Sequence, residues 1–247
     1  MNIFITGGTT GIGLALAKLY LEEGHRVGIC ARNLDKFPTE IRNKYKLLSC
    51  YQVDVVNRDE VRAAILDFAK GDLDMVIANA GRSVGAKSKT PKFTVACEIM
   101  DINIKGVLNT FEVALEIMMP KKKGHLVATA SVAGFMGLPG AGPYSASKAA
   151  VLKLCESLSI DLKRSGINVT AIAPGFVDTP LTQQNNHKMP FLMSSEKAAK
   201  LIMRALEKKK VLYVFPLRMA IAVCILEKMP RRWYRWIMSF KFINYSS

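Results

Sequence analysis

The stretch of sequence that decides the fold is NIFITGGTTGIG, residues 2–13. Its short apolar run predicts a buried strand, and apolar residues recur at helical spacing over 14–20. Gly7, Gly11 and Gly13 stand between the two and let the backbone turn sharply toward a pyrophosphate, which the first helical amides then stabilise. A tight turn without a ligand is the alternative. The order of strand, glycine turn and helix favours a dinucleotide site, and the residues expected to form it are Gly7, Thr9, Thr10, Gly11, Ile12 and Gly13.

Beyond this stretch, short β-branched apolar runs alternate with longer segments of helical spacing. Strands are predicted at 2–6, 26–31, 47–53, 73–78, 125–130, 167–173 and 211–215. Helices are predicted at 11–23, 58–70, 93–119, 144–164 and 195–208, with a short one around 33–44 that Pro38 interrupts. This pattern predicts the α/β class, as a Rossmann-type doubly wound parallel sheet of about seven strands with helices on both faces. We expect residues 1–216 to form a single dinucleotide-binding catalytic domain and residues 217–247 a basic, aromatic extension.

Arg32 follows the second predicted strand, where a site that prefers NAD places a carboxylate for the ribose 2′-hydroxyl. No carboxylate stands there. A planar, permanently charged guanidinium suits a 2′-phosphate instead, so the predicted cofactor is NADP(H). The alternative is that Arg32 is a solvated loop charge.

Two further groups of residues follow the third and fourth predicted strands. Asp54 and Val55 come after the third, where a carboxylate can meet the adenine amino group. Asn79, Ala80 and Gly81 come after the fourth, where small residues allow a close cofactor approach. Each group also suits an ordinary strand-end turn. Because open α/β sheets bind ligands at the carboxyl edge, we expect both groups to lie in one cofactor site.

Tyr144 and Lys148 lie four residues apart in a predicted helix, hence on one face. A nearby ammonium stabilises a phenolate, so Lys148 is expected to lower the pKa of Tyr144 into the range of acid–base catalysis. Ser131 ends the fifth predicted strand and can stabilise charge that develops on a substrate oxygen. Alone, such a Tyr–Lys pair is usually a packing contact on a helix surface. Its combination with the other motifs favours catalysis.

In their order and spacing these motifs resemble the classical short-chain dehydrogenase/reductase family, over residues 1 to about 216. The resemblance rests on Thr6, Gly7, Gly11, Ile12, Gly13, Asp54, Asn79, Ala80, Gly81, Asn103, Ser131, Tyr144, Lys148, Pro174 and Gly175. Two departures are mild: Gly8 stands where alanine is common, and Ala78 where the family often has a second asparagine.

The resemblance implies a catalytic tetrad of Asn103, Ser131, Tyr144 and Lys148. Tyr144 would protonate the carbonyl oxygen, Ser131 would polarise it, and Lys148 would also hold the nicotinamide ribose. Asn103 would secure a water that connects Lys148 to solvent; the sequence itself shows only an asparagine in a helical segment. The loop after the sixth strand would contact the carboxamide end of the cofactor through Pro174, Gly175, Val177 and Thr179. The helices at 93–119 and 144–164 look like those that pair in family homodimers and homotetramers.

The function that follows is an NADP(H)-dependent oxidoreductase that interconverts a carbonyl and an alcohol. We expect a reductase of an apolar or lipid-like molecule, because the second half of a short lid, Pro180 to Met193, is apolar. Phe135, Met136 and Leu138 are expected on the opposite wall, although all these residues suit core packing equally well. His187 is interpreted as a loop histidine. The rival hypothesis is a catalytically silent NADP(H)-binding sensor or scaffold, against which the joint presence of Ser131, Tyr144 and Lys148 argues.

Composition and charge narrow the classes of partner and of site that the chain is expected to have. The formal net charge is +15, and nine of the 35 Lys and Arg residues lie from Lys208 onward, against Glu227 alone. With no nucleic-acid-reading motif, this tail suits an anionic membrane surface or an acidic partner better than DNA. A helix that packs over the substrate site or a dimer partner is equally open. Five scattered cysteines and three separated histidines suggest neither disulfides nor a metal site, and a reducing, cytoplasmic location is expected.

Overall fold

Seven parallel strands form one sheet in the computed structural model, which describes residues 1–35, 37–83, 92–184 and 189–240. Their order across the sheet is β3-β2-β1-β4-β5-β6-β7. The strands are β1 Asn2–Thr6, β2 Arg26–Ala31, β3 Leu48–Gln52, β4 Met75–Ala78, β5 Gly124–Thr129, β6 Ile167–Pro174 and β7 Leu212–Phe215. Neighbours pair in parallel throughout, so the predicted doubly wound sheet is confirmed.

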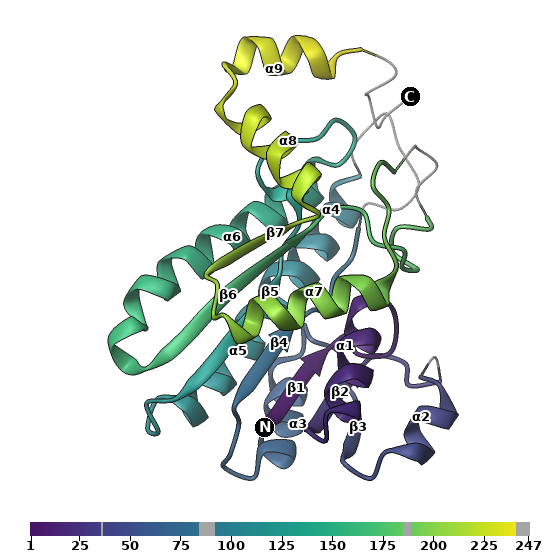
Figure 1. Cartoon of the computed structure of the whole chain (residues 1–247), viewed down its shortest axis with the longest axis vertical. Coiled ribbons are helices and arrows are strands. Elements are labelled where there is room, and N and C mark those ends of the chain that lie inside the picture. Colours follow the sequence, from purple (N-terminus) through teal and green to yellow (C-terminus); the bar gives the residue numbers. More distant parts are fainter. Residues whose placement is uncertain (36, 84–91, 185–188, 241–247) are drawn as a thin grey trace.

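Helices cover both faces of the sheet (Figure 1). The alternation of β1 decides the packing: Phe4 joins the core on one face, and Ile3 and Ile5 join the core on the other. The Phe4 face packs on α3 Arg58–Ala69, α5 Gly106–Met118 and α6 Gly142–Asp161. The other face packs on α1 Gly11–Glu22, α2 Thr39–Lys44 and α7 Ser195–Glu207.

Three predicted helices differ from the observed ones. The segment around 33–44 is helical only as α2, which begins directly after Pro38, since proline tolerates only the start of a helix. The predicted helix 93–119 is divided into α4 Phe93–Met100, a π-helical turn Asp101–Lys105 and α5. The predicted helix at 144 begins two residues earlier, with Pro143 in its first turn, where the missing N–H costs nothing.

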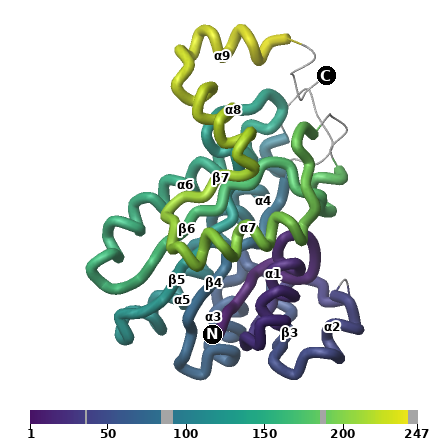
Figure 2. The backbone as a smooth tube through the Cα atoms, in the orientation of Figure 1, coloured from purple at the N-terminus to yellow at the C-terminus, as the bar shows by residue number. Residues whose placement is uncertain are grey.

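The C-terminal segment folds into two short helices, α8 Leu217–Lys228 and α9 Arg231–Met238, separated at Pro230. They lie together at one end of the molecule, away from the N-terminus (Figure 2). Of the helices in the described ranges, none has the length and apolar character needed to cross a bilayer.

His125 gives the sheet a pH-dependent stability. Its Nε2 lies 2.7 Å from Thr170 Oγ1, and that hydroxyl donates to the Lys210 carbonyl at 2.6 Å, so Nε2–H donates to Thr170. Burial first, and then the nearby Lys209, lower the pKa of His125 from 6.5 to about 4. The stabilisation is therefore present above pH 6.5 and is lost as the pH falls toward 4. In this range the imidazole binds a proton in the unfolded protein but stays neutral in the folded protein.

We expect the free energy of unfolding to fall by about 3 kcal/mol from this group between pH 6.5 and 4. Urea denaturation at both pH values measures it, with His125→Gln as the comparison, because glutamine retains a donor but does not titrate. An equal pH dependence in both proteins contradicts the assignment.

Candidate active site

The glycine turn after β1 has room for backbone only. Gly7 adopts a φ of +66°, and a Cβ placed on it lies 2.8 Å from Ala80 Cα. A Cβ on Gly13 lies 2.2 Å from the Gly7 carbonyl oxygen. Real Cβ contacts are not this short, so α1 starts directly beneath the turn only because both residues are glycine.

Gly8 accounts for one of the two sequence departures. A Cβ on this residue lies 2.6 Å from Ile29 Cβ, within the sheet core. Ile29 is fully buried, so it has no space into which to move. Glycine is therefore the residue that fits beside this particular second strand.

The first turn of α1 leaves its amides available to an anion. Thr10 is the extended N-cap residue, and its side chain makes no capping hydrogen bond. The first turn also carries no acidic side chain. Thr10, Gly11 and Ile12 line a cavity at the carboxyl edge of the sheet, so positive dipole ends of the amides meet whatever occupies it.

Asn79 fastens three strand ends together. Its side-chain nitrogen donates to the Thr6 and Gly7 carbonyls, each at 3.2 Å, and its side-chain oxygen accepts from Thr129 Oγ1 at 3.2 Å. The Thr6 hydroxyl oxygen in turn accepts from the amides of Asn79 and Ala80, at 3.0 and 3.1 Å. The Asn79 side chain thus holds the glycine turn in place. The sequence had predicted only that the small residues at 79–81 allow a close approach of the cofactor.

Two adjoining cavities, of about 190 and 260 Å³, make up what we call the edge cleft. They share Gly7, Thr10, Ala80, Gly81 and Pro180. The larger one also contains predicted residues from the ends of three elements, namely Thr9, Arg32, Asp54 and Val55. The smaller one contains Asn79, Ser131, Tyr144, Lys148, Pro174, Gly175, Val177 and Thr179. The structure therefore brings all but two of the predicted site residues to one cleft.

Arg32 and Asp54 hold different positions in the larger cavity. The exposed Arg32 guanidinium lies in the same cavity as Thr9 and Asn33, and it forms no salt bridge within the described part of the chain. Asp54 is fixed, because its Oδ1 accepts from the Val56 amide at 3.1 Å and its own amide donates to Glu60 at 2.9 Å. The cavity thus has a free cation at one point and a rigid carboxylate at another.

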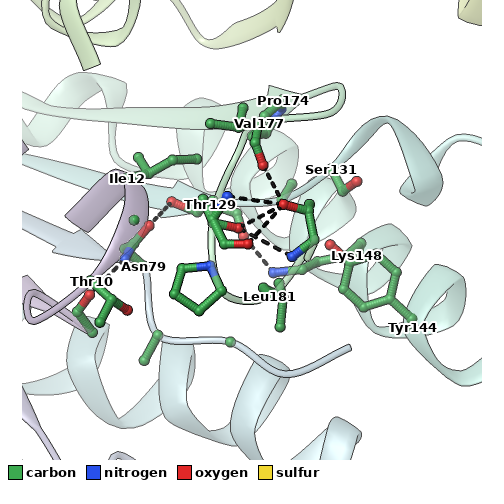
Figure 3. A pocket seen from close by; sticks show the side chains of 18 of the residues that line it. Thr10, Ile12, Asn79, Thr129, Ser131, Tyr144, Lys148, Pro174, Val177 and Leu181 are labelled. Carbon is green, nitrogen blue, oxygen red and sulfur yellow. Dashed lines mark hydrogen bonds between the residues drawn. The ribbon is translucent and has the colours of Figure 1, made fainter. Parts of the chain in front are cut away.

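Ser131, Tyr144 and Lys148 lie together at the other side of the smaller cavity (Figure 3). Ser131 follows the end of β5, and its hydroxyl oxygen accepts from the Ala133 amide at 3.1 Å. Lys148 is 4% exposed, and its ammonium donates to the Thr129 carbonyl at 2.7 Å. Tyr144 and Lys148 share one side of α6, as their spacing predicted, with the Lys148 nitrogen 5.8 Å from the centre of the Tyr144 ring.

The pKa values differ from the sequence-based expectation. Burial raises the pKa of Tyr144, a shift that the hydrogen bond with Ser131 partly offsets. Burial lowers the pKa of Lys148 to about 8. The predicted lowering of the Tyr144 pKa by Lys148 is wrong for this arrangement, because the ammonium is directed at Thr129 and desolvation outweighs it. The tyrosine is consequently a protonated phenol at neutral pH.

Asn103 is one of the two predicted residues that do not line the cleft. It is fully buried in the π-helical turn. Its oxygen accepts from the Arg82 amide at 2.8 Å, and its nitrogen donates to the Arg82 carbonyl at 3.0 Å and to Ser147 Oγ at 2.9 Å. Gly81 lies between Asn103 and Lys148, since a Cβ on it lies 3.3 Å from the one and 3.5 Å from the other. Asn103 thus positions the backbone next to Lys148, and its role toward a water stays a prediction. The second residue is Gly13, which packs beneath Gly7.

Thr182 is a cleft residue that the sequence reasoning missed. Its hydroxyl donates to the Val177 carbonyl at 2.6 Å and accepts from the Thr179 amide at 3.0 Å, which closes the loop after β6 on itself. A threonine three residues after Thr179 is the sequence signal for such a local turn. The remaining lining residues of the cleft carried no such signal, apart from Pro180 and Leu181 of the predicted lid; they are Thr129 and Ala130 in the smaller cavity and Ala31, Asn33, Val53 and Ile102 in the larger one.

A third cavity, of about 270 Å³ and here called the apolar cavity, adjoins the cleft, with which it shares Ser131, Tyr144, Gly175, Leu181 and Thr182. Met136 and Leu138 line it as predicted, whereas Phe135 does not line it and packs against the cluster of Met136, Val223, Tyr234 and Met238. The opposite wall comes from the C-terminal helices, through Met219, Ala222, Val223, Leu226 and Met238. The tail helices thus pack over this cavity, and its assignment as the substrate site stays a prediction.

The expected lid contributes less than predicted. Leu181, Thr182 and Pro190 line the apolar cavity. Phe191 and Leu192 are exposed, at 47% and 46%. Met193 is buried in the sheet core and bridges to Val177. The apolar half therefore divides between core, cavity and solvent, and residues 185–188, which include His187, lie outside the described residues.

Comparison with known proteins agrees with this geometry. A family model described as short chain dehydrogenase matches residues 1–190. An uncharacterised oxidoreductase of Myxococcus xanthus (strain DK1622) is 35% identical over 231 residues, which cover 92% of this chain and 91% of that protein. An uncharacterised oxidoreductase of Staphylococcus aureus (strain N315) is 35% identical over 210 residues, covering 83% of this chain and 90% of that one.

Solved structures show the same arrangement of elements. The structure of ElxO with NADP bound has a TM-score of 0.74 at 29% identity and covers 82% of this chain and 90% of its own. A short chain dehydrogenase from Burkholderia cenocepacia J2315 has a TM-score of 0.84 at 21% identity, covers 96% and 97% of the two chains, and shows the likeness of fold. From its motifs, its sheet order and the match over residues 1–190, the chain belongs to the short chain dehydrogenase family.

Proposed function

We propose that the protein reduces a carbonyl group of an apolar molecule, with NADPH as the hydride donor. The observation that carries the proposal is the position of Ser131 and Tyr144, which line both the edge cleft and the apolar cavity. A molecule in the apolar cavity and a cofactor in the cleft would meet at these two hydroxyl groups. Groups that do chemistry are expected at such a junction.

The residues of the cleft fit NADPH. The glycine turn is packed so closely that it excludes a Cβ at Gly7 and Gly13, and the uncapped start of α1 offers amides to a pyrophosphate. Arg32 offers two parallel donors to a 2′-phosphate. The NADP bound to ElxO, a relative at 29% identity, supports the same choice. When bound, NADPH supplies the hydride.

Each residue of the junction then has a defined task. The Tyr144 phenol, protonated because burial raises its pKa, donates its proton to the carbonyl oxygen. The Ser131 hydroxyl holds that oxygen and stabilises its developing charge. The Lys148 ammonium, whose Nζ is anchored on the Thr129 carbonyl, supplies positive charge on the cleft side. Asn103 keeps the backbone beside Lys148 in place.

A series of linear methyl ketones of rising chain length tests the proposal through the oxidation of NADPH. The apolar cavity predicts that kcat/KM increases with each added methylene, by up to about four-fold per buried group, until the cavity is full. A preference for small polar ketones contradicts the apolar substrate. NADPH binding without turnover of any carbonyl compound would instead favour the sensor hypothesis.

Lys148 sets a pH limit on the reaction. Its pKa of about 8 in the folded protein means that the charged form is present below pH 8 and is lost as the pH rises through that value. We expect kcat/KM for NADPH, which reports on the free enzyme, to be level below pH 8 and to fall about ten-fold per pH unit above it. In Lys148→Arg the fall is expected to disappear, because a guanidinium does not deprotonate in this range. A profile that stays level to pH 10 in the wild type excludes this role.

Three broader inferences accompany the proposed function. We infer that residues 1–216 carry the catalytic machinery, since Pro216 is the last residue before α8. A cytoplasmic location and a homodimer or homotetramer stay predictions from the sequence. Sedimentation of the full-length protein measures the oligomeric state directly.

A further inference from the structure

The C-terminal helices α8 and α9 have an inner face that is part of the apolar cavity. Met219, Val223 and Leu226 of α8 line it, together with Met238 of α9. Tyr234 fixes α9 in this place, because its hydroxyl donates to the Gly137 carbonyl at 2.7 Å. The inner face thus points toward the body of the protein, partly in contact with it and partly along the cavity.

The outer face of α8 is apolar as well. Leu217, Ile221 and Ile225 follow one another at a spacing of four residues, which places them on one side of the helix. They are 74%, 53% and 59% exposed. A surface helix of a soluble protein normally presents polar residues on its outer side, so this stripe calls for a partner that accepts apolar side chains.

The outer face of α9 is aromatic. Trp233 and Trp236 are 52% and 59% exposed, and Phe240, which follows the end of the helix, is 38% exposed. The rings of Trp236 and Phe240 contact each other edge to face, with centroids 4.9 Å apart. Tryptophan is enriched where a protein meets the headgroup level of a bilayer, because its ring is apolar and its N–H is polar.

The charge of these helices is almost entirely positive. Residues 217–240 contain five cations, Arg218, Lys228, Arg231, Arg232 and Arg235, and the single carboxylate Glu227. None of the five forms a salt bridge with another described residue. The Arg232 guanidinium lies 5.9 Å from the Trp233 ring centre, so charge and aromatic surface adjoin. Basic residues beside exposed aromatic rings complement an anionic lipid surface.

The apolar surface continues to the rim of the cavity. Pro190 lines the apolar cavity, and the next residue, Phe191, is 47% exposed. The Phe191 ring centre lies 5.7 Å from the Arg218 guanidinium of α8. The exposed apolar surface therefore reaches the apolar cavity, which the inner faces of α8 and α9 line.

We propose that the outer faces of α8 and α9 dock on the surface of an anionic bilayer, and that the apolar cavity takes a carbonyl compound dissolved in that bilayer. The second part rests on the proposed function, whereas the docking does not. Docking leaves the helices lying on the surface, with their apolar and aromatic side chains at the acyl boundary.

Both tryptophans of the chain, Trp233 and Trp236, are in this surface, so intrinsic tryptophan fluorescence reports on it alone. The full-length protein is mixed with vesicles of phosphatidylcholine, or of phosphatidylcholine with phosphatidylglycerol, and then sedimented. We expect binding and a blue shift of the emission with the anionic vesicles only, and release when added salt shortens the Debye length.

Two double variants with matched controls locate the contact. Arg232→Gln with Arg235→Gln is expected to weaken vesicle binding by on the order of ten-fold or more. The control pair Lys163→Gln with Arg164→Gln alters two exposed residues just beyond the end of α6 and is expected to leave binding unchanged. Trp233→Ala with Trp236→Ala weakens binding similarly, and the control Ile160→Ser, which alters a 71% exposed residue of α6, does not.

Three outcomes overturn the docking: no binding to anionic vesicles, equal binding of the tail variants and the wild type, or tail variants that break up an oligomer without any effect on vesicles. The last would identify the face as a contact between copies of this chain. Reduction of a water-soluble ketone by NADPH, measured without vesicles, tests the proposed function separately and is expected to be unchanged in the tryptophan variant. If the protein docks but reduces no carbonyl compound, only the substrate part fails.

Discussion

Replacing Tyr144 by phenylalanine lowers kcat for ketone reduction by a factor on the order of 10³ or more, while the affinity for NADPH stays roughly the same. The phenol is the proton donor in the proposed reaction, and its ring is retained in the variant, so the wall that Tyr144 contributes to both cavities is unchanged. Stopped-flow absorbance of NADPH oxidation gives the rate, and quenching of protein fluorescence or calorimetry gives the affinity.

Tyr51→Phe is the matched control, because it also removes one tyrosine hydroxyl. That hydroxyl donates to Asp67 at 2.7 Å on the surface of the protein, and Tyr51 does not line the cleft. Its loss is expected to leave kcat unchanged. A Tyr144→Phe protein that turns over at the wild-type rate refutes the assignment of the proton donor.

Arg32→Gln lowers kcat/KM for NADPH by on the order of 50-fold and leaves the value for NADH nearly unchanged. The expected loss corresponds to about 2–3 kcal/mol for a charge-assisted hydrogen bond. The two cofactors differ only in the 2′-phosphate, so the ratio of the two values isolates the contact with that group. Steady-state kinetics with each cofactor at one saturating ketone concentration measures it.

Arg42→Gln controls for a general effect of removing positive charge, since Arg42 lies in the nearby α2 but does not line the edge cleft. It should leave the preference for NADPH intact. If Arg32→Gln lowers the values for NADPH and NADH equally, the guanidinium does not select the phosphate, and the interpretation of Arg32 as a solvated charge is correct.

The fold followed closely from the sequence because the signal is repeated in every strand. Each predicted strand lies within two residues of the observed one, since a buried parallel strand is a short β-branched run bounded by turn residues. The helical errors have local causes. The π-helical turn at Asp101–Lys105 adds one residue to a helix turn, which shifts later residues without disturbing the apolar pattern, so composition alone does not reveal it.

The candidate site was predictable where it depends on strand ends. Arg32, Asp54, Asn79 and Ser131 each follow a strand, and a parallel sheet brings such residues to one edge regardless of side-chain detail. The apolar cavity was not predictable from the sequence, because the position of its wall depends on the direction in which α8 leaves the sheet. The sequence showed that the tail is apolar and basic, but both the inner stripe at Met219 and the outer stripe at Leu217 satisfy that description.

The pKa of Tyr144 marks a second limit. Its spacing from Lys148 correctly placed both on one side of α6, but the balance between charge and desolvation depends on what else surrounds them. The Lys148 ammonium donates to the Thr129 carbonyl, and nothing in the sequence indicates this contact. Pair spacing predicts proximity, whereas the protonation state depends on the three-dimensional environment.

The apolar cavity has a wall that comes from the C-terminal helices, so its shape can change without a change in the residues of the edge cleft. Residues 1–190, which match the family model, contain Ser131, Tyr144 and Lys148, whereas much of the wall opposite them comes from residues 219–238. In the proposed function, the residues that carry the reaction thus lie in the first segment of the polypeptide, and a large part of the wall that would recognise the substrate lies in the second. A tail grafted from another member of the family after Pro216 would give the same hydride-transfer machinery a different range of substrates, and swapping tails between relatives offers a direct way to redirect it.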